Sequence, residues 1–410
     1  FFRRDSNNVN HLSGKIKSDE FDLGRTINNS NFGLVSLNGE LDALAQFEDS
    51  RVKFSGDIPR IDYKGYSYNN INMDGVIKDQ VFNGKLSVND KNLEFDFDGS
   101  VDFSIPNQQK FDFVAELKKA NITKINWANR DTSAQLSGKL RVNLSGKDIE
   151  DINGDLKLRD LTWKEKGKVY KIDSVTLKSI KEKDREMMTL KSDIVFAKIE
   201  GNYNLKEIYP TIINVLSKEV PSLINAVENK RYKGGNKFSV MIKLNDYQMI
   251  NELFTPSINF SNKTRLSGRF DDSKKSFVLN FASDSIRLNN KIIQDIKLYS
   301  NNRGNKLNLV GKSKYIQIVN KMGIENFTFN SNIEDNLVNY KIGYQNNNKI
   351  STYGDINGTV DLSDLDTIKF GVNKSAIVYR DFIWQIDTTA SVSISKNFIN
   401  IKNFNLFSHD

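Results

Sequence analysis

Apolar and polar residues alternate along most of this chain. From Leu93 to Phe103, every odd position is apolar or glycine and every even position is polar. The stretches 136–144 and 238–244 repeat the alternation on even positions. A period of two places the apolar residues on one face of a β-strand and the polar residues on the other. A strand buried on both faces reads as a continuous apolar run, so the pattern predicts strands with one apolar and one solvated face.

A short internal repeat, apolar-x-Gly-x-apolar, accompanies the alternation. Glycine inside a strand marks a sharp bend or a close approach of another group to the backbone. Because each glycine shares a face with its apolar neighbours, a row of them across many strands would let the sheet fold along a crease. Unrelated bulges in a large sandwich are the alternative explanation. The predicted crease glycines are Gly14, Gly39, Gly56, Gly75, Gly84, Gly99, Gly138, Gly154, Gly268 and Gly358.

Composition extends the pattern to the whole fold. The 410 residues include 26 Phe, 14 Tyr and 24 Gly but only 5 Pro. Paired asparagines, among them 28–29, 69–70 and 301–302, are predicted to mark tight turns, because asparagine tolerates a positive φ. These features predict about 30 hairpin-linked strands. Open sheets rarely exceed about 10 strands without curling or splitting. Since no linker separates sandwiches, we predict an all-β fold: a long, curled antiparallel sheet forming an extended apolar groove, with a short helical insert.

Residues 206–233 break the alternation with apolar residues at helical spacing. Pro210 and Pro221 stand where first helical turns begin, which predicts helices at about 207–218 and 221–230. A third short helix is predicted over 246–253. We expect these helices to cover the sheet, with a plug or a membrane-surface helix as alternatives. The predicted organisation is a first part of the groove (1–205), a helical insert (206–235) and a second part (236–410) of one continuous repeat region.

An apolar trough cannot stand empty in water, because exposed apolar surface costs about 25 cal/mol per Å². It must close on itself as an ordinary core or hold long apolar ligands, and acyl chains fit a groove without a polar anchor. The predicted lining residues are Leu12, Ile16, Leu37, Leu41, Phe54, Ile58, Leu86, Val88, Leu93, Phe95, Phe97, Val101, Phe103, Leu136, Leu140, Val142, Leu144, Leu156, Leu158, Phe238, Val240, Ile242, Leu266, Phe270, Phe327, Phe329, Ile386, Val392 and Ile394.

Candidate chemistry is sparse. The chain has no cysteine, and its two histidines, His11 and His409, stand near the two ends. Disulfides, thiol chemistry and a metal site built on Cys or clustered His are therefore excluded, and a Ser-His-Asp mechanism nearly so. The adjacent carboxylates Asp271 and Asp272 are expected to be turn residues rather than an acid–base pair. We predict no catalytic residue, no cofactor and no metal, and hence no enzyme.

The net charge of +8 and pI near 9.1 raise the possibility of nucleic-acid binding. The basic residues are spread along the chain, so a solvated outer face is expected, with attraction to anionic headgroups or to a partner as the alternative. A mean hydropathy of −0.51 and the lack of an apolar run near the ~20 residues of a membrane helix predict a soluble chain. No signal peptide is recognised, and the alternation runs to the last residues, so an interior segment of a longer protein is expected.

Several segments carry a family resemblance. They are FDLG at 21–24, LVSLNG at 34–39, YKGYSYNNINMDG at 63–75 with FNGKLSVND at 82–90, LKKANI at 117–122 and LFTP at 253–256. Together with the repeat, they resemble the TamB-type translocation and assembly module proteins of the AsmA-like, bridge-like lipid-transfer group. The resemblance extends over essentially the whole chain and contains no catalytic signature.

The resemblance implies a β-groove of taco cross-section in the periplasm of a diderm bacterium, spanning inner to outer membrane. The implied activity is passage of phospholipids between the membranes. Implied partners are phospholipids, an outer-membrane insertase barrel of the TamA type or a lipoprotein form of it, and the inner membrane through a segment absent here. No nucleic acid is implied.

Two other classes of function remain open. A scaffold for outer-membrane protein assembly would offer sheet edges to unfolded chains by β-augmentation. A surface adhesin or β-solenoid would have a closed core and parallel coils, which the closely spaced hairpin turns disfavour.

Overall fold

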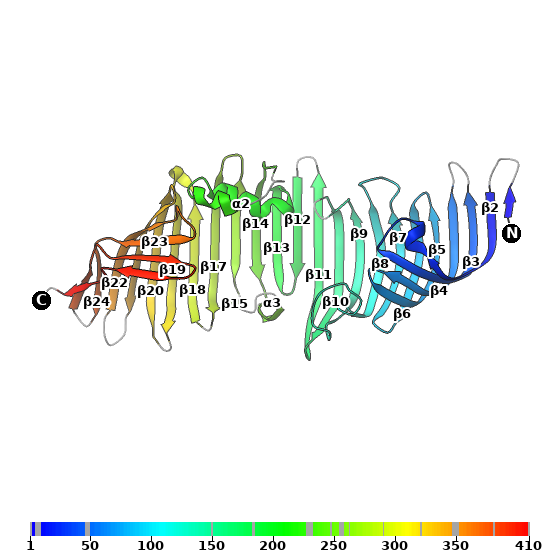
Figure 1. Ribbon diagram of the computed structural model, residues 1–410, viewed down its shortest axis with the longest axis horizontal. Coiled ribbons are helices and arrows are strands. Elements are labelled where there is room, and N and C mark those ends of the chain that lie inside the picture. The colour runs from blue at the N-terminus through cyan, green and yellow to red at the C-terminus, as the bar shows by residue number, and fades with distance from the viewer. Residues whose placement is uncertain are drawn as a thin grey trace. The chain divides into compact units, whose positions relative to one another are not determined.

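The computed structural model describes residues 2–4, 10–45, 50–148, 151–182, 185–226, 233–246, 248–253, 258–261, 263–289, 291–319, 322–346, 352–379 and 382–408. Within these ranges the chain is all-β and forms 28 strands. They belong to one large antiparallel sheet that does not close on itself (Figure 1). The predicted fold class is therefore confirmed. Many of the strands contain 10–15 residues.

The chain divides into two compact units, and the division falls inside strand β12 (Arg185–Ser192). Unit 1 comprises residues 1–181 and 189–193. Its other elements are β1 (Phe2–Arg4), β2 (Asn10–Asp22), α1 (Leu23–Thr26), β3 (Phe32–Ala45), β4 (Arg51–Tyr63), β5 (Tyr66–Lys78), β6 (Val81–Asp90), β7 (Leu93–Asp102), β8 (Lys110–Asn121), β9 (Gln135–Ser145), β10 (Asn153–Glu165) and β11 (Lys168–Glu182). From β1 to β11 each strand pairs with its neighbours in sequence, as a continuous meander.

Unit 2 comprises residues 182–188 and 194–410. Its strands are β13 (Val195–Asn202), β14 (Lys237–Leu244), β15 (Ile258–Phe260), β16 (Arg265–Asp271), β17 (Ser276–Leu288), β18 (Lys291–Asn301), β19 (Leu307–Val319), β20 (Met322–Glu334), β21 (Leu337–Asn346), β22 (Thr352–Asp361), β23 (Thr367–Val372), β24 (Ser375–Tyr379), β25 (Phe382–Ile386), β26 (Ser391–Ser395), β27 (Ile399–Lys402) and β28 (Leu406–Ser408). Beyond β22 the sheet splits into two branches, β23–β26–β27 and β24–β25–β28.

Strand register gathers the apolar side chains of each unit on one face of the sheet, here called the apolar face. In unit 1, one cross-strand row consists of Gly39, Gly56, Met73, Leu86, Phe97, Ala115, Leu140, Leu158 and Val175. In unit 2, a row consists of Ala197, Ile242, Leu266, Phe281, Leu298, Gly311, Phe329, Ile342 and Ile356. Residues that face each other in an antiparallel pair share a face, so the predicted alternation holds across the strands of each unit.

The opposite face carries charged pairs between neighbouring strands. In unit 1, Lys85 Nζ lies 3.3 Å from Asp98 Oδ2, and Arg141 Nη2 lies 2.6 Å from Asp112 Oδ1. All four side chains are exposed, so these pairs add little stability and mainly keep the face soluble.

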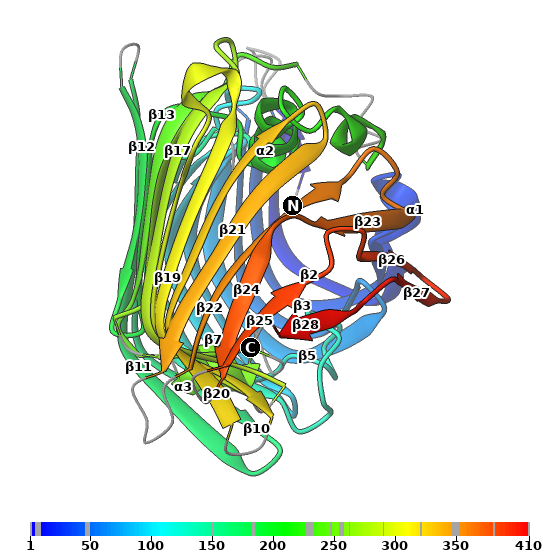
Figure 2. The same ribbon diagram turned by 90° about the vertical axis from the view of Figure 1, so that its left-hand side faces the viewer.

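The helical insert lies in unit 2 between β13 and β14. It consists of η1 (Leu205–Glu207), α2 (Ile208–Leu216) and η2 (Pro221–Ala226), followed by residues 227–232, which lie outside the described ranges. The predicted first helix is thus confirmed, whereas the second is a 3₁₀ helix as far as it is described. A shorter helix α3 (Gln248–Leu253) precedes β15, and a 3₁₀ turn, η3 (Arg303–Asn305), joins β18 to β19. Figure 2 shows α2 on the inner side of the curled strands of its unit.

One turn prediction is wrong. Asn69 and Asn70 lie inside β5, although Asn70 does adopt the expected positive φ, of 55°. A left-handed residue inside a strand interrupts the alternation. As a result Tyr68 and Ile71, three positions apart, enter the same buried cluster. Asp160, with a φ of 54°, occupies a similar position inside β10, beside a register shift.

Candidate apolar binding groove

All of the predicted lining residues except Phe103 lie in strands, on the apolar face of the sheet. Most are half-buried. Six are buried: Val88, Leu93, Val142, Phe238, Phe270 and Ile386. Three are exposed: Leu12, Phe103 and Ile394. Phe103 follows the end of β7, and its ring contacts that of Phe111, with 6.3 Å between the centroids.

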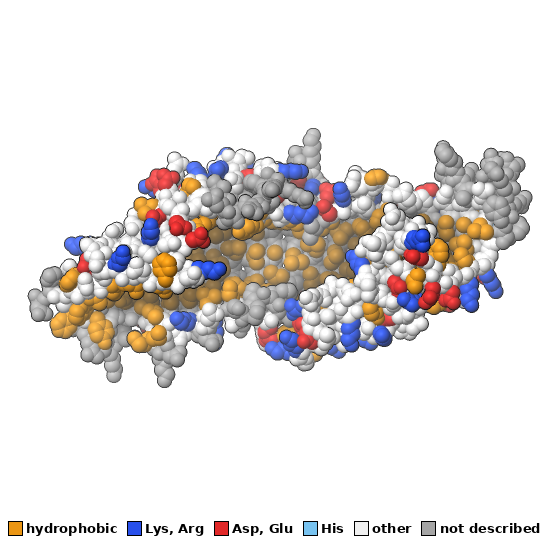
Figure 3. Space-filling model, in the orientation of Figure 1, with side chains coloured by type: hydrophobic (Ala, Val, Ile, Leu, Met, Phe, Trp, Pro, Cys, Tyr) orange, Lys and Arg blue, Asp and Glu red, His pale blue; other side chains and the backbone are white. Residues whose placement is uncertain are grey.

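Hydrophobic side chains line the hollowed side of the sheet, and charged side chains gather at its rims (Figure 3). Aromatic rings reinforce this lining across strands. In unit 1, Phe97 lies between Phe82 and Phe113, with ring centroids 6.0 and 4.9 Å away. In unit 2, Phe270 stacks between Phe238 and Phe277 at 5.3 and 6.0 Å. Such ring pairs add about 0.5–1.5 kcal/mol each beyond simple burial.

The crease glycines are places where neighbouring backbones approach closely. Gly39 faces Gly56, and Gly75, Gly84 and Gly99 form a row across β5, β6 and β7. A Cβ on Gly84 would lie 2.4 Å from the carbonyl oxygen of Asp74. The clash would be with the sheet itself, so these glycines allow the close approach of neighbouring strands rather than of a ligand.

The other glycines of the repeat do not extend that row. Gly14, Gly138 and Gly154 face leucines on the adjacent strands, and Gly358 faces Tyr340. A Cβ on Gly138 would meet its nearest atoms at 3.3 Å, a much milder contact. The glycines of the repeat thus fall into several short register rows, and left-handed residues such as Asn70 also interrupt strands.

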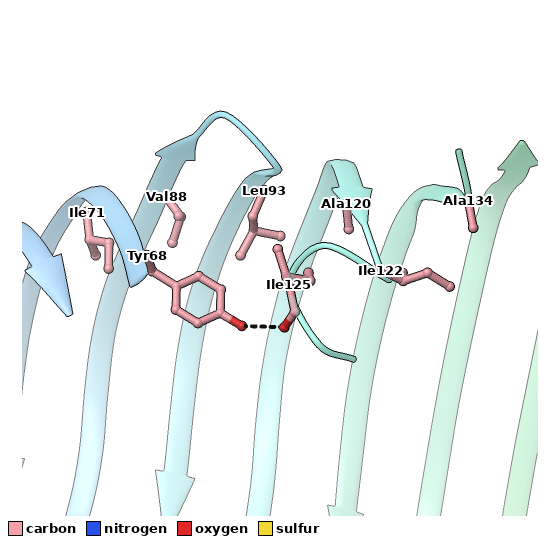
Figure 4. Close-up of a cluster of buried hydrophobic side chains, with 8 residues drawn as sticks. All are labelled: Tyr68, Ile71, Val88, Leu93, Ala120, Ile122, Ile125 and Ala134. Carbon is pink, nitrogen blue, oxygen red and sulfur yellow. Dashed lines mark hydrogen bonds between the residues drawn. The ribbon is translucent and has the colours of Figure 1, made fainter. Parts of the chain in front are cut away.

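One lip of unit 1 is covered by the loop between β8 and β9, residues 122–134. Ile125 and Ala134 of this loop are 1% and 0% exposed and pack with Tyr68 and Leu93 (Figure 4). Trp163 packs against the same cluster. The Tyr68 hydroxyl lies 3.4 Å from the carbonyl oxygen of Ile125. The loop therefore closes this lip with a small, dry core.

Polar contacts hold the two ends of the loop. Asn126 Nδ2 donates to the carbonyl oxygen of Lys64, 3.2 Å away, in the β4–β5 hairpin. At the other end, Arg130 Nη2 donates to Glu165 Oε2 over 2.6 Å, and the Asp131 N–H donates to Glu165 Oε1. The Arg130 hydrogen bond lowers the pKa of Glu165 below its ordinary value, against the opposing effect of burial.

The helical insert covers one lip of unit 2 in a comparable way. Val215, 0% exposed, packs with Phe238, Phe270 and Phe277. This burial confirms the expectation that the insert covers the sheet.

Hydrogen bonds fix the insert to three successive strand turns. Asn214 donates to Asp272, the Asn302 amide donates to Glu219 Oε1 over 3.3 Å, and the Asn336 N–H donates to the carbonyl oxygen of Glu219. Glu219 is 2% exposed, and its burial raises the pKa of its carboxyl group.

The solvated face of unit 1 carries a shallow depression of about 920 Å³, lined mainly by charged side chains. On β9 and β10, Lys139 faces Arg159 and Arg141 faces Lys157. Directly opposed like charges repel one another. Acidic partners offset this repulsion for three of the four, since Lys139 lies 3.9 Å from Glu116 and Lys157 and Arg141 also have acidic neighbours. Leu86, Phe97, Ala115 and Leu140, which belong to the apolar row, also contribute to the lining of this depression.

The apolar face carries mainly aliphatic and aromatic side chains. Among the described residues, no group of three or more His, Cys, Asp or Glu side chains could hold a metal ion. Nor does the described part of the chain contain a helix long and apolar enough to cross a membrane. What this face offers is a broad surface of aliphatic and aromatic side chains.

Sequence reasoning did not identify the covering loop of unit 1 or its anchors. Two sequence features could have indicated this loop: the apolar residues Ile122 and Ile125 after a strand, and a connection longer than the neighbouring two-residue turns. Comparison of the chain with protein-family models, with curated proteins and with solved structures finds no match.

Proposed function

We propose that this protein carries lipid acyl chains along the apolar face of its curled sheet, as a bridge-like conduit for phospholipids. The observation that supports this most directly is the cross-strand register, which collects half-buried Leu, Ile, Val and Phe side chains into rows on the hollow face. Half-buried apolar side chains gain further burial when an apolar ligand lies against them, at about 25 cal/mol per Å².

Backbone hydrogen bonding favours an acyl chain over a peptide as the occupant. Within the meander from β2 to β10, every strand is paired on both edges, so its N–H and C=O groups are used inside the sheet. A peptide lying on this face would bury its own N–H and C=O groups without partners, at a cost of about 1–3 kcal/mol each. A hydrocarbon chain carries no such groups.

The resemblance to TamB-type proteins supports the same proposal and supplies its setting. We infer a bridge across the periplasm of a diderm bacterium that works with an insertase barrel of the TamA type. The chain has no catalytic role in this proposal, because lipid movement along a groove needs no nucleophile, acid or metal.

Native mass spectrometry of the purified protein tests the proposal. Bound phospholipids that detergent or organic solvent releases are expected, at a ratio that rises when the protein is incubated with liposomes. A protein that stays free of lipid after such incubation would contradict the conduit.

A pair of variants on adjacent strands separates a conduit from a closed core. Leu140→Glu places a charge on the apolar face, whereas Val114→Glu places one on the solvated face opposite Arg141. Leu140→Glu is expected to lose bound lipid and transfer between liposomes while keeping its β-sheet circular dichroism. Val114, already 44% exposed, should tolerate the change with lipid binding intact. Global unfolding of Leu140→Glu would instead indicate an ordinary core, since an unpaired buried charge costs several kcal/mol.

A second candidate, the scaffold for outer-membrane protein assembly, is favoured by one feature of unit 2. Strands β27 and β28 each have a single paired neighbour among the described residues, and Ile399, Ile401 and Leu406 are 66%, 60% and 46% exposed. Such edges are suited to β-augmentation. Crosslinking of an unfolded outer-membrane protein to a cysteine introduced at Asn400, and not to one at Asn143 inside the sheet, would support this role.

A further inference from the structure

The two lips of unit 1 differ in how they are closed. Successive hairpins alternate between the lips, so the turns at 64–65, 91–92 and 166–167 share one lip with the loop 122–134. This is the covered lip. The turns at 79–80 and 103–109, together with residues 146–148 after β9, lie on the other, here called the open lip. Backbone hydrogen bonds tie these turns together, from the Phe103 N–H to Gln80 and from the Gly146 N–H to Gln109.

Among the described residues of unit 1, none covers the apolar row nearest the open lip. This row consists of Leu12, Ala43, Val52, Ile77, Phe82, Val101, Phe111 and Leu144. None of the eight is buried. Leu12, Val52 and Ile77 are 46%, 38% and 45% exposed, and beyond them Phe103 and Ile105 are 50% and 44% exposed. A run of exposed aliphatic side chains along one rim is unusual for a soluble surface and marks a place where something apolar passes or binds.

We propose that unit 1 is loaded with lipid over its open lip, while the covered lip stays shut. This inference rests on the proposed lipid-carrying function and adds the route of entry. The occupant is a two-chain phospholipid whose acyl chains slide past Ile77 and Phe103 onto the apolar face, while its headgroup stays in water at the polar turns beyond them.

The energetic difference between the lips supports this direction. Entry at the covered lip would expose the core around Ile125 and Ala134 and would break the contacts of Arg130 with Glu165. Entry at the open lip breaks no such core, because its apolar side chains already face solvent. The strands that carry this row pair with neighbours on both edges, so their N–H and C=O groups are already used. The row therefore suits hydrocarbon chains rather than an added β-strand.

Matched charge substitutions on the two lips test the route. Ile77→Glu and Phe103→Glu lie on the open lip. Ile27→Glu and Val169→Glu lie at the covered lip, where the original side chains are 49% and 53% exposed. All four sites are exposed, so each variant is expected to fold. The readout is the initial rate at which the purified 410-residue chain takes up a fluorescent phosphatidylethanolamine from liposomes.

The initial rate of lipid uptake should fall at least about tenfold in the open-lip variants, because the acyl chains must move past an ionised carboxylate. Covered-lip variants should load at the rate of the unmodified protein. Equal slowing by both pairs, or slowing by the covered-lip pair alone, overturns the inference.

A crosslinking experiment tests the entry route independently. Because the chain lacks cysteine, the double variant Lys64→Cys/Asn126→Cys can be joined by a short bis-maleimide that ties the covering loop to the β4–β5 hairpin. Loading at an unchanged rate after crosslinking supports entry over the open lip, and a block relative to the uncrosslinked double variant overturns it. Failure of the unmodified protein to take up any lipid would overturn the proposed function and this inference together, whereas normal total uptake with the wrong lip dependence overturns only the inference.

Discussion

Gly75 and Gly84 face each other on β5 and β6 so closely that a Cβ on Gly84 would lie 2.5 Å from the Cα of Gly75. No side chain larger than hydrogen fits at this point without moving the backbone of a neighbouring strand. The repeat that is visible in the sequence therefore marks, at this pair, a point where two adjacent strands approach closely.

Gly84→Ala should destabilise unit 1 by about 1–3 kcal/mol, as expected for overpacking a closely packed position. Urea unfolding followed by circular dichroism measures the change. Gly138→Ala is the matched control, since its Cβ would meet its neighbours at 3.3 Å, and it should cost clearly less. Equal losses in the two variants would argue against the close approach of β5 and β6.

The Arg130–Glu165 contact predicts a pH dependence for the covering loop of unit 1. The folded-state pKa of Glu165 lies below its ordinary value of 4.5, chiefly because Arg130 donates to the carboxylate. Its contribution to stability is therefore complete above about pH 4.5 and is lost as the pH falls through the lower folded-state pKa. Hydrogen exchange of the Asp131 amide should accelerate over that acidic range.

Glu165→Gln should abolish that acid dependence and cost about 1–3 kcal/mol at neutral pH, through loss of the charged hydrogen bonds. Unchanged exchange at Asp131 in this variant would indicate that the loop is held by its apolar contacts alone.

Glu219 should act in the opposite sense. Burial raises its pKa, while Lys218, Asn302 and Lys275 oppose that shift. The native state therefore holds this proton more tightly than the unfolded chain. The stability gained from it is present at pH values below the ordinary pKa of 4.5 and is lost as the pH rises through the raised folded-state value.

Glu219→Gln keeps an oxygen for the Asn302 amide and removes the buried charge. At pH 7 unit 2 should be equally stable or more stable, by up to about 2 kcal/mol, and the part of the pH dependence due to Glu219 should vanish. Thermal unfolding of both proteins across pH 4–8 checks this. Strong destabilisation of the variant at neutral pH would mean that the carboxylate itself is required.

Phe270→Ala should cost about 3–5 kcal/mol, because this 6% exposed ring stacks between two others in the core beneath α2. Phe382→Ala removes a 55% exposed ring from the same unit and should change stability by less than about 0.5 kcal/mol. Chemical unfolding of the two variants gives the comparison.

Much of the fold followed from the alternation, because a period of two is a direct property of strand geometry. The apolar rows and the antiparallel hairpins were predicted in this way, and the helical insert from the helical spacing that interrupts the alternation. The positions of the bends were predicted only in part, since glycine was taken as their marker. Asn70 and Asp160 also interrupt strands. The positive φ of Asn70 was expected, but the sequence placed it in a turn between strands rather than inside β5.

The candidate site was harder to predict than the fold. A face can be assigned from local pattern, but its covers depend on distant contacts, such as that of Asn126 with Lys64, 62 residues apart. Nothing in the local sequence around Ile125 indicates that it packs against β5. The difference between the two lips of unit 1 therefore became apparent only in three dimensions.

The pairing of strands with their neighbours in sequence has a consequence for the history of the molecule. In the meander of unit 1 each hairpin depends on the two beside it, so stability is a sum of nearest-neighbour contributions and folding can spread from any starting point. Duplication or loss of a hairpin would leave the rest of the sheet intact. Evolution can thus lengthen or shorten such a sheet in steps of one hairpin.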